Sequence, residues 1–317
     1  MFLSDLILAL PRVERLFAFS EMADLNSEQI SAFMHRHQLP KGFHGVIKNH
    51  YLPLSDWLRN IKQSGTEIFA ISGAQGTGKT TLAKFLKLAL RKKYDWSVAR
   101  LSLDDFYFTR SERKNLGKNI HPLLSTRGAP GTHDLNFCIQ TLTKLRKLKK
   151  NETLKLPRFD KSIDDRLSSN NWPTVSGPID AVIFEGWCLG SEAQADTLLS
   201  NPINELEEKK DVDATWRTYV NNQLRNNYPD LFQLFDKLIF LQAPNISAVH
   251  HWRQEQETKL AQKSHSSKSG IMDTQQINKF IQHYERITRS NIDRLPKIAD
   301  VTMVLGTNHQ ILNTFYR

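Results

Sequence analysis

Cysteine is scarce in this chain, and long apolar runs are missing from it. Its 317 residues include two cysteines, Cys138 and Cys188, which form no CxxC pattern. This argues against a disulfide framework or a cysteine-based zinc site, and favours a reducing compartment such as the cytoplasm. No apolar run approaches the ~20 residues that a membrane-spanning helix needs. The first residues, MFLSDLILALPRVERLF, carry Asp5 inside the apolar run and no positive leader, so we expect no signal peptide.

Basic residues outnumber acidic ones, 43 to 33, giving a net charge of +10. Such a surplus suits either a nucleic-acid-binding protein or a protein that handles small anions. The densest basic stretch, LTKLRKLKKNETLK at 142–155, is typical of the solvated face and end of a helix. It has no interleaved aromatic residues and matches no nucleic-acid-binding module. We therefore favour small anionic molecules as partners over nucleic acid or membrane.

Short apolar runs alternate with helical patterns from residue 66 onward. The runs carry few charges, as expected of strands buried on both faces of a parallel sheet. The predicted strands are 66–72, 96–103, 180–186, 236–243 and 301–306, and helical spacing marks 81–94, 135–150 and 215–228. This alternation predicts an α/β protein with an open parallel sheet and helices on both faces, a three-layer fold.

Helical patterns also flank this core. Residues 1–50 are poor in strand signals, and a helix at 26–38 has Ser27 or Asn26 as its N-cap, so we expect an N-terminal helical extension before a main domain at 51–317. A short helix at 54–63 leads into that domain.

Residues 73–80, GAQGTGKT, match the phosphate-binding loop pattern GxxxxGK[ST] between a predicted strand and an amphipathic helix. Backbone N–H groups of such a loop surround phosphate oxygens, and the helix N-terminus adds partial positive charge. Lys79 is placed to reach the terminal phosphates, and the Thr80 hydroxyl to hold Mg²⁺. The sequence therefore predicts a site for ATP and Mg²⁺ built from Gly73, Ala74, Gln75, Gly76, Thr77, Gly78, Lys79, Thr80 and Thr81.

Carboxylates follow two other predicted strands. SLDDFY places Asp104 and Asp105 at a strand end, the edge where open α/β sheets bind ligands. One of the pair can accept a proton from a hydroxyl that attacks the γ-phosphate; the alternative is that the pair caps the next helix or turn. Glu185, in VIFEGW, resembles a Walker-B carboxylate that holds Mg²⁺ through water or orders the site.

The segment at about 245–290 reads as helix, polar loop (KSHSSKSG, 263–270) and helix. Asp273 is the expected cap of the second helix, with Gln276 three residues on. A helical hairpin at this place in the chain is a candidate lid over the nucleotide, and the alternative is a plain surface hairpin.

Together, GAQGTGKTTLA, SLDDFY, RGAPGTHD, LPRFDKSIDDR and VIFEGWCLG resemble the phosphoribulokinase, uridine kinase and pantothenate kinase superfamily of P-loop small-molecule kinases. Within it the chain is most similar to the D-glycerate 3-kinase branch, over about residues 45–310. The P-loop alone is generic, whereas the other elements in this order are specific.

The resemblance implies roles residue by residue. Asp104 becomes the general base, with Asp104, Thr80 and Glu185 as metal candidates, and Asp105 a neighbour that serves Mg²⁺ or substrate. In the lid, the resemblance implies that Arg253 contacts phosphate, and Lys259 is the other remaining cation where uridine kinases carry more arginines in a row. The implied acceptor-site residues are Asp105, Tyr107, Arg127, His133, Asp134, Asp160, Lys161 and Arg166, and those flanking the adenine are Asn308 and His309.

The acceptor candidates carry much positive charge, from Arg127, His133, Lys161 and Arg166. Such charge suits a carboxylate or phosphate, and a neutral nucleoside would not need it. Phe159 and Trp187 either close the pocket or pack in the core. We expect ATP-dependent phosphorylation of D-glycerate to 3-phosphoglycerate. The alternatives are another acceptor, namely a nucleoside, pantothenate or a sugar phosphate, or a partner-coupled P-loop ATPase.

Overall fold

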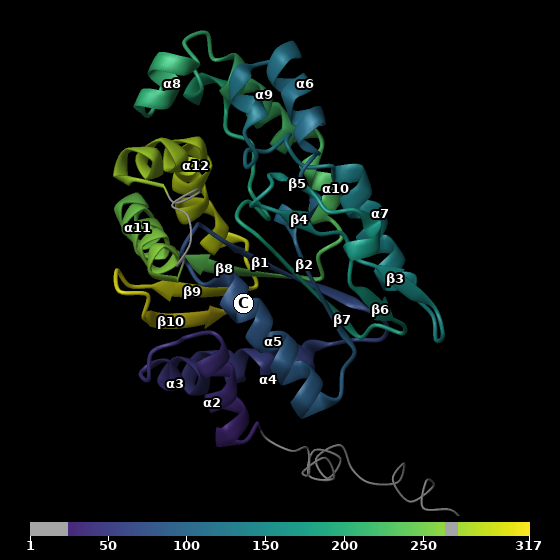
Figure 1. The fold of residues 1–317 in the computed structure, drawn as a ribbon. Helices are drawn as coiled ribbons and strands as arrows, with labels where there is room; N and C mark the ends of the chain where they lie inside the picture. The colour runs from purple at the N-terminus through teal and green to yellow at the C-terminus, as the bar shows by residue number, and fades with distance from the viewer. Residues whose placement is uncertain (1–24, 264–271) are drawn as a thin grey trace, which may run out of the picture.

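The computed structural model describes residues 25–263 and 272–317. Its central sheet has the order β10-β9-β8-β1-β7-β2 (Figure 1). Neighbours from β2 to β9 are parallel, and β10 pairs antiparallel with β9 at the edge. The predicted three-layer α/β fold is confirmed, with an antiparallel edge strand that the pattern did not predict. The strands are β1 (Glu67–Gly73), β2 (Val98–Ser102), β7 (Ala181–Gly186), β8 (Lys237–Gln242), β9 (Val301–Leu305) and β10 (Ile311–Tyr316).

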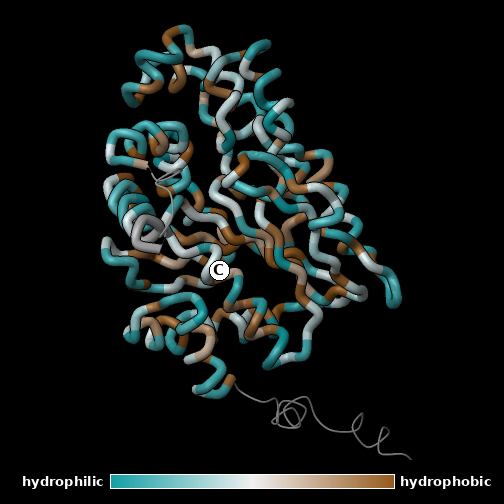
Figure 2. Tube along the Cα trace, viewed as in Figure 1, coloured by the Kyte–Doolittle hydropathy of each residue, from teal (hydrophilic) through white to brown (hydrophobic). Residues whose placement is uncertain are grey.

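The central strands are buried on both faces, which explains their nearly uncharged sequences. All seven residues of β1 are buried. Phe69 and Ile71 of β1 join the hydrophobic cluster on one face, while Ile68 and Ala70 join the cluster on the other. Figure 2 shows the hydrophobic colour concentrated on these strands and the hydrophilic colour on the outer helices. Burial of both faces requires helices above and below the sheet.

Two helical layers meet this requirement. On one face lie α2 (Ser27–Arg36), α4 (Leu52–Ile61) and α5 (Lys79–Tyr94), and on the other lie α7 (Leu135–Lys147), α9 (Thr215–Asn226) and α10 (Tyr228–Phe232). Asn26 caps α2, and Phe33 of that helix packs on Phe85 of α5 with ring centroids 5.3 Å apart.

The helical character of the N-terminal region is confirmed where the structure describes it, from residue 25. After α2, α3 (Phe43–Val46) and a π-helical turn, η2 (Ile47–Tyr51), lead directly into α4. Residues 1–24 lie outside the described residues, and the division at residue 50 stays a prediction.

The helical hairpin is present as two helices, α11 (Ile246–Lys263) and α12 (Thr274–Arg294). Asp273 caps α12 and forms the expected capping box with Gln276. Most of the predicted loop, residues 264–270, lies outside the described residues. Among the described helices, none combines the length and apolarity needed to cross a membrane.

Smaller elements are inserted around β2 and β7. Two short antiparallel strand pairs occur between α7 and β7, and the inner pair, a hairpin that lies in the chain between the two strands of the outer pair, carries part of the PRFDKS motif. The insertions are α6 (Arg110–Asn119), α8 (Glu205–Lys210), β3 (Thr153–Lys155) with β6 (Thr174–Ser176), β4 (Phe159–Asp160) with β5 (Asp165–Arg166), and the 3₁₀ turns η3 (Leu103–Phe106), η4 (Pro122–Ser125), η5 (Ser169–Asn171), η6 (Asp196–Leu198) and η7 (Leu295–Lys297).

Candidate active site

A cleft of about 650 Å³ lies at the carboxyl ends of β1, β2 and β7. The hairpin α11–α12 and the β4–β5 hairpin contribute to its walls. Of the predicted site residues, those that line it are Gln75, Gly76, Lys79, Thr80, Asp104, Asp105, Tyr107, Arg127, Lys161, Glu185 and Arg253, together with Phe159 and Trp187. The predicted site residues that are not among the lining residues are Gly73, Ala74, Thr77, Gly78, Thr81, His133, Asp134, Asp160, Arg166, Asn308 and His309.

The phosphate-binding loop joins β1 to α5 through backbone that requires glycine. Gly76 and Gly78 have φ of +84° and +89°, and Gly78 starts α5. A Cβ on Gly76 would lie 2.5 Å from Cβ of Trp252 in α11, so the loop and the hairpin are in close contact. Within the loop, the Thr77 hydroxyl donates to the Ala74 carbonyl at 2.8 Å. The loop is therefore held in shape by the fold itself, with the α5 N-terminus facing the cleft.

Lys79 extends along the loop into the cleft. Its Nζ donates to the Ala74 carbonyl at 3.4 Å. Burial lowers the pKa of Lys79, and the charges of Glu185 and Asp104 oppose that shift. A half-buried cation near two carboxylates at a helix start is a suitable partner for a phosphate chain.

Glu185, at the end of β7, contacts Thr80 at the start of α5. The Thr80 hydroxyl donates to Oε1 of Glu185 at 2.7 Å, and Nη1 of Arg100 lies 3.6 Å from the same oxygen. Glu185 is 3% exposed, so its carboxylate is kept inside the cleft wall. A hydroxyl and a carboxylate oxygen side by side are the donor types that Mg²⁺ prefers, and these residues fit that ion.

The two aspartates after β2 differ in what they contact. Asp105 closes a capping box with Ser102, accepting from its backbone N–H at 3.0 Å, and pairs with Nη1 of Arg158 at 3.1 Å. Asp104 instead faces the cleft, where Oδ1 accepts from the Tyr107 hydroxyl at 2.9 Å and Oδ2 pairs with Nζ of Lys161 at 2.6 Å. The capping alternative thus applies to Asp105, while Asp104 is positioned for chemistry.

The ionisation of Asp104 is controlled by nearby lysines. Burial alone would raise the pKa of Asp104, but the charges of Lys161 and Lys79 outweigh burial and lower the pKa below its usual value. The opposite balance holds for Asp105, where burial prevails and raises its pKa. At neutral pH Asp104 is therefore an ionised carboxylate beside two cations.

The β4–β5 hairpin brings Lys161 to the cleft on a turn tied to the protein body. Asp164 in this turn pairs with Nη2 of Arg113 at 3.0 Å and also with Arg127. Arg113 is fully buried. Arg127 also lies over the Phe159 ring, 5.8 Å from its centroid. Arg127 and Lys161 thus flank the cleft as predicted, with Arg127 engaged by an acid that the sequence did not single out.

His133 and Arg166 lie behind the cleft wall and support Tyr107. The His133 ring stacks on Tyr107 with centroids 4.4 Å apart, and its Nδ1 is 2.6 Å from the Tyr228 hydroxyl. Burial lowers the pKa of His133 to about 4. Arg166 donates to the Tyr107 carbonyl at 2.9 Å and lies 3.4 Å from Asp134, the cap of α7. Their direct contact with an acceptor stays a prediction, since these residues act here on Tyr107.

Asp160 turns away from this group. Its Oδ1 accepts from the backbone N–H and the hydroxyl of Ser162, at 2.8 and 2.6 Å, and these bonds lower its pKa. Asp160 therefore shapes the turn that carries Lys161.

The candidate lid places one arginine in the cleft. Arg253 of α11 pairs with Glu257 one turn on, and its guanidinium lies 4.9 Å from the centroid of Phe280 in α12. The same helix contacts the loop before β10, where Trp252 stacks on His309 at 4.7 Å. The adenine role of Asn308 and His309 stays a prediction, and the side chain of Lys259 lies outside the described residues.

Sequence reasoning missed several residues that line the cleft: Arg100, Ser102, Arg158, Asp164 and Tyr284. A usable signal existed for Arg100, a single cation inside the apolar run of β2, and for Arg158 inside the PRFDKS motif. Tyr284 had none, because nothing local in α12 shows that its ring meets Trp187, with centroids 4.8 Å apart.

Several known proteins are similar to this chain in sequence or fold. No family model matches the chain. An uncharacterized kinase of Schizosaccharomyces pombe is 35% identical over 225 residues, covering 68% of this chain and 78% of that one. The chloroplastic D-glycerate 3-kinase of Arabidopsis thaliana is 30% identical over 256 residues, covering 75% of this chain and 53% of the relative. A solved D-glycerate 3-kinase from Cryptococcus neoformans superposes with a TM-score of 0.68 at 27% identity, covering 84% of this chain and 96% of that one.

Proposed function

Because the chain belongs to the superfamily of P-loop kinases, we propose that it transfers the γ-phosphoryl group of ATP to a hydroxyl of D-glycerate, giving 3-phosphoglycerate. The observation that carries this proposal is the position of Asp104. Its carboxylate faces the cleft that contains Lys79, with two cations, Lys161 and Arg127, on the acceptor side. That arrangement suits a hydroxyl acceptor that also bears a carboxylate.

The residues divide the work of in-line phosphoryl transfer. The P-loop and Lys79 would hold the triphosphate, while Asp104 would orient the acceptor hydroxyl and accept its proton. Thr80 and Glu185 would hold Mg²⁺, which when bound neutralises charge on the phosphate oxygens. Arg253 would stabilise charge on the migrating group from the lid side. Exclusion of water by the α11–α12 hairpin would suppress ATP hydrolysis.

The acceptor is tested by ADP release from Mg·ATP with D-glycerate, L-glycerate, uridine, pantothenate and ribulose 5-phosphate supplied separately. We expect turnover with D-glycerate. Turnover with one of the other acceptors alone would replace D-glycerate and keep the kinase. ATP hydrolysis that responds to none of them would favour the partner-coupled ATPase, which predicts stimulation by a macromolecule instead.

A further inference from the structure

Both oxygens of the expected base are engaged in the structure. Oδ2 of Asp104 pairs with Nζ of Lys161 at 2.6 Å, and Oδ1 accepts from the Tyr107 hydroxyl at 2.9 Å. A carboxylate that accepts a proton from an alcohol needs an oxygen directed at that alcohol, within hydrogen-bond distance. Each oxygen keeps a second lone pair, so an acceptor hydroxyl either shares an oxygen with its present partner or displaces that partner. Transfer of the hydroxyl proton to Oδ2 is easier once the Lys161 ammonium has left that oxygen.

Lys161 is the partner that can leave. Its side chain is 60% exposed, whereas Tyr107 is buried at 3%. An ion pair with a solvent-exposed partner contributes little to stability, so it can be exchanged easily. Moving the Tyr107 ring would instead disturb its stacking on His133.

The turn that carries Lys161 is fixed at both ends. Asp160 accepts two hydrogen bonds from Ser162, and Asp164 pairs with the buried Arg113. The backbone is thereby anchored while the four-carbon side chain of Lys161 remains free to swing. Lys161 can thus change partner within the cleft without rearrangement of the hairpin.

We propose that the anionic group of the acceptor draws Lys161 off Asp104, so that the base is released only when an anionic acceptor is bound. This inference rests on the proposed function and deepens it. A hydroxy acid both binds Lys161 and frees Oδ2, whereas a neutral polyol or water offers nothing that a lysine ammonium would prefer to a carboxylate. Lys161 is then a specificity-determining residue that touches the acceptor.

The chemical step that follows is balanced. The acceptor oxygen forms a bond to the γ-phosphorus, and its proton passes to Oδ2 of Asp104. The bond from the γ-phosphorus to the β–γ bridging oxygen breaks, and its electron pair leaves with ADP. Lys161, bound to the acceptor carboxylate, no longer withdraws charge from the base.

The other ionisable groups that face Asp104 stay in place during this exchange. They are Lys79 of α5, His133 before α7, Asp105 and Tyr107 around η3, Cys188 after β7 and Tyr284 of α12.

The test compares Lys161→Gln and Lys161→Arg with wild type, and uses Lys155→Gln as a matched control on an exposed strand residue. Rates are measured with D-glycerate, with glycerol and without acceptor. For Lys161→Gln we expect kcat/KM with D-glycerate to fall about ten- to hundredfold, the loss of a hydrogen bond to a charged group. Discrimination against glycerol should fall by a similar factor, and ATP hydrolysis without acceptor should rise. Lys161→Arg should keep most of the discrimination.

If Lys161→Gln, folded by its thermal melt, loses turnover while discrimination and ATP hydrolysis stay as in wild type, the inference is wrong.

The two proposals fail in different ways. An enzyme that does not use D-glycerate refutes the proposed acceptor. The measurement of ATP hydrolysis in Lys161→Gln needs no acceptor and still decides the role of Lys161: a rise above wild type and Lys155→Gln supports the inference, and no change overturns it.

Discussion

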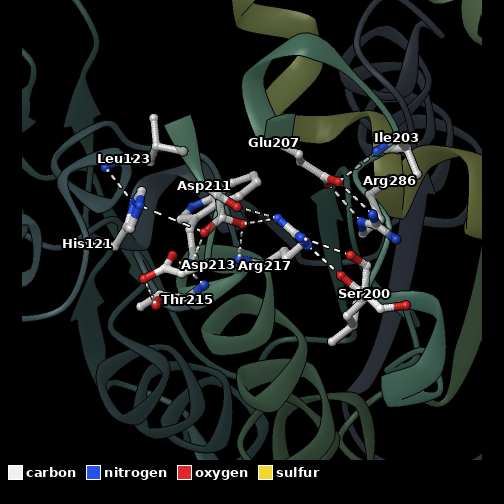
Figure 3. A network of polar contacts seen from close by, with 12 residues as sticks. His121, Leu123, Ser200, Ile203, Glu207, Asp211, Asp213, Thr215, Arg217 and Arg286 are labelled. Atoms are coloured by element: carbon white, nitrogen blue, oxygen red, sulfur yellow. Dashed lines mark hydrogen bonds and ion pairs between the residues drawn. The ribbon is translucent and has the colours of Figure 1, made fainter. Parts of the chain in front are cut away.

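Two networks of ion pairs in this protein each join a basic side chain to an aspartate, and they differ in their exposure to solvent. In the cleft, the side chains of Lys161 and Asp104 are 60% and 30% exposed. In the network around α8 and α9 (Figure 3), the side chains of Arg217 and Asp211 are 3% and 0% exposed. The first pair lies where a ligand can reach it and the second where none can.

The buried network also has its hydrogen bonds satisfied. Asp211 accepts from the backbone N–H of Trp216 at 2.6 Å and from the backbone N–H and Nη1 of Arg217 at 3.1 and 2.9 Å. His121 and Asp213 bring their ligand atoms within 4.8 Å of it, as a metal site would require, but the ion pair with Arg217 already balances the Asp211 charge. We interpret Asp211 as the anchor of the α9 N-terminus. Saturated pairs fix one conformation, whereas a pair with an exposed partner can be exchanged for substrate.

The largest effect should come from Asp104→Asn, which removes the base and keeps its shape. We expect kcat to fall about 10²- to 10⁴-fold, the range for loss of a general base, with little change in ATP affinity or melting temperature. Single-turnover ADP release and equilibrium ATP binding measure the two quantities. A rate near that of wild type would transfer the role of base to Asp105 or Glu185.

For Arg217→Met, in the buried network, we expect the converse of Asp104→Asn: stability should fall and activity should be unchanged. Removing one partner leaves the Asp211 charge buried and uncompensated, so the free energy of unfolding should fall by about 3–5 kcal/mol. Activity per folded molecule should stay as in wild type, because the residue does not line the cleft. Urea unfolding and active-site titration separate the two readouts, and Arg225→Met, on an exposed pair of the same helix, is the control. A loss of activity without loss of stability would contradict the contrast between the networks.

The sequence predicted those parts of the molecule that local patterns determine. Alternating apolar runs predicted the strands to within a few residues, and GAQGTGKT predicted the loop, because both are local patterns. The antiparallel β10 was missed since its exposed residues, Asn313 among them, give no buried-strand signal.

For the site, strand-end position found Asp104 and Glu185. What the sequence could not give is the partner of each charge. Asp164 is 37 positions from Arg127 and 51 from Arg113, and only the fold brings the three together. Likewise, the sequence could not show that His133 and Arg166 both contact Tyr107, through its ring and its carbonyl.

We expect acid to lower the stability of the protein by protonating His133. This residue lies behind the cleft wall and is as deeply buried as the second network. His133 titrates near 6.5 when exposed in the unfolded chain and near 4 when folded. The unfolded chain therefore binds the extra proton between these values, and stability falls as pH is lowered through this window. We expect His133 to account for about 2–3 kcal/mol of the loss between pH 7 and 4.5. Urea unfolding of wild type and His133→Gln at both pH values measures it, since the variant should lose that share. An equal loss in both proteins would show that other groups carry the acid sensitivity.

Asp164 joins the two kinds of network in one residue, because its carboxylate bridges the fully buried Arg113 and the partly exposed Arg127 of the cleft. Asp164→Asn keeps a hydrogen-bond acceptor but removes the charge, so we expect a modest loss of stability, about 1–2 kcal/mol.

The Asp164→Asn substitution should also release Arg127 from its ion pair and loosen the turn that carries Lys161. The first change strengthens attraction for an anionic acceptor and the second weakens its positioning, so KM and kcat should move separately. We expect kcat to fall several-fold, with KM for D-glycerate changed less than kcat. Thermal melts and steady-state kinetics on the same preparation decide the matter: a stability loss with unchanged kinetics would place Asp164 wholly with the buried network, and a kinetic change alone would place it wholly with the cleft.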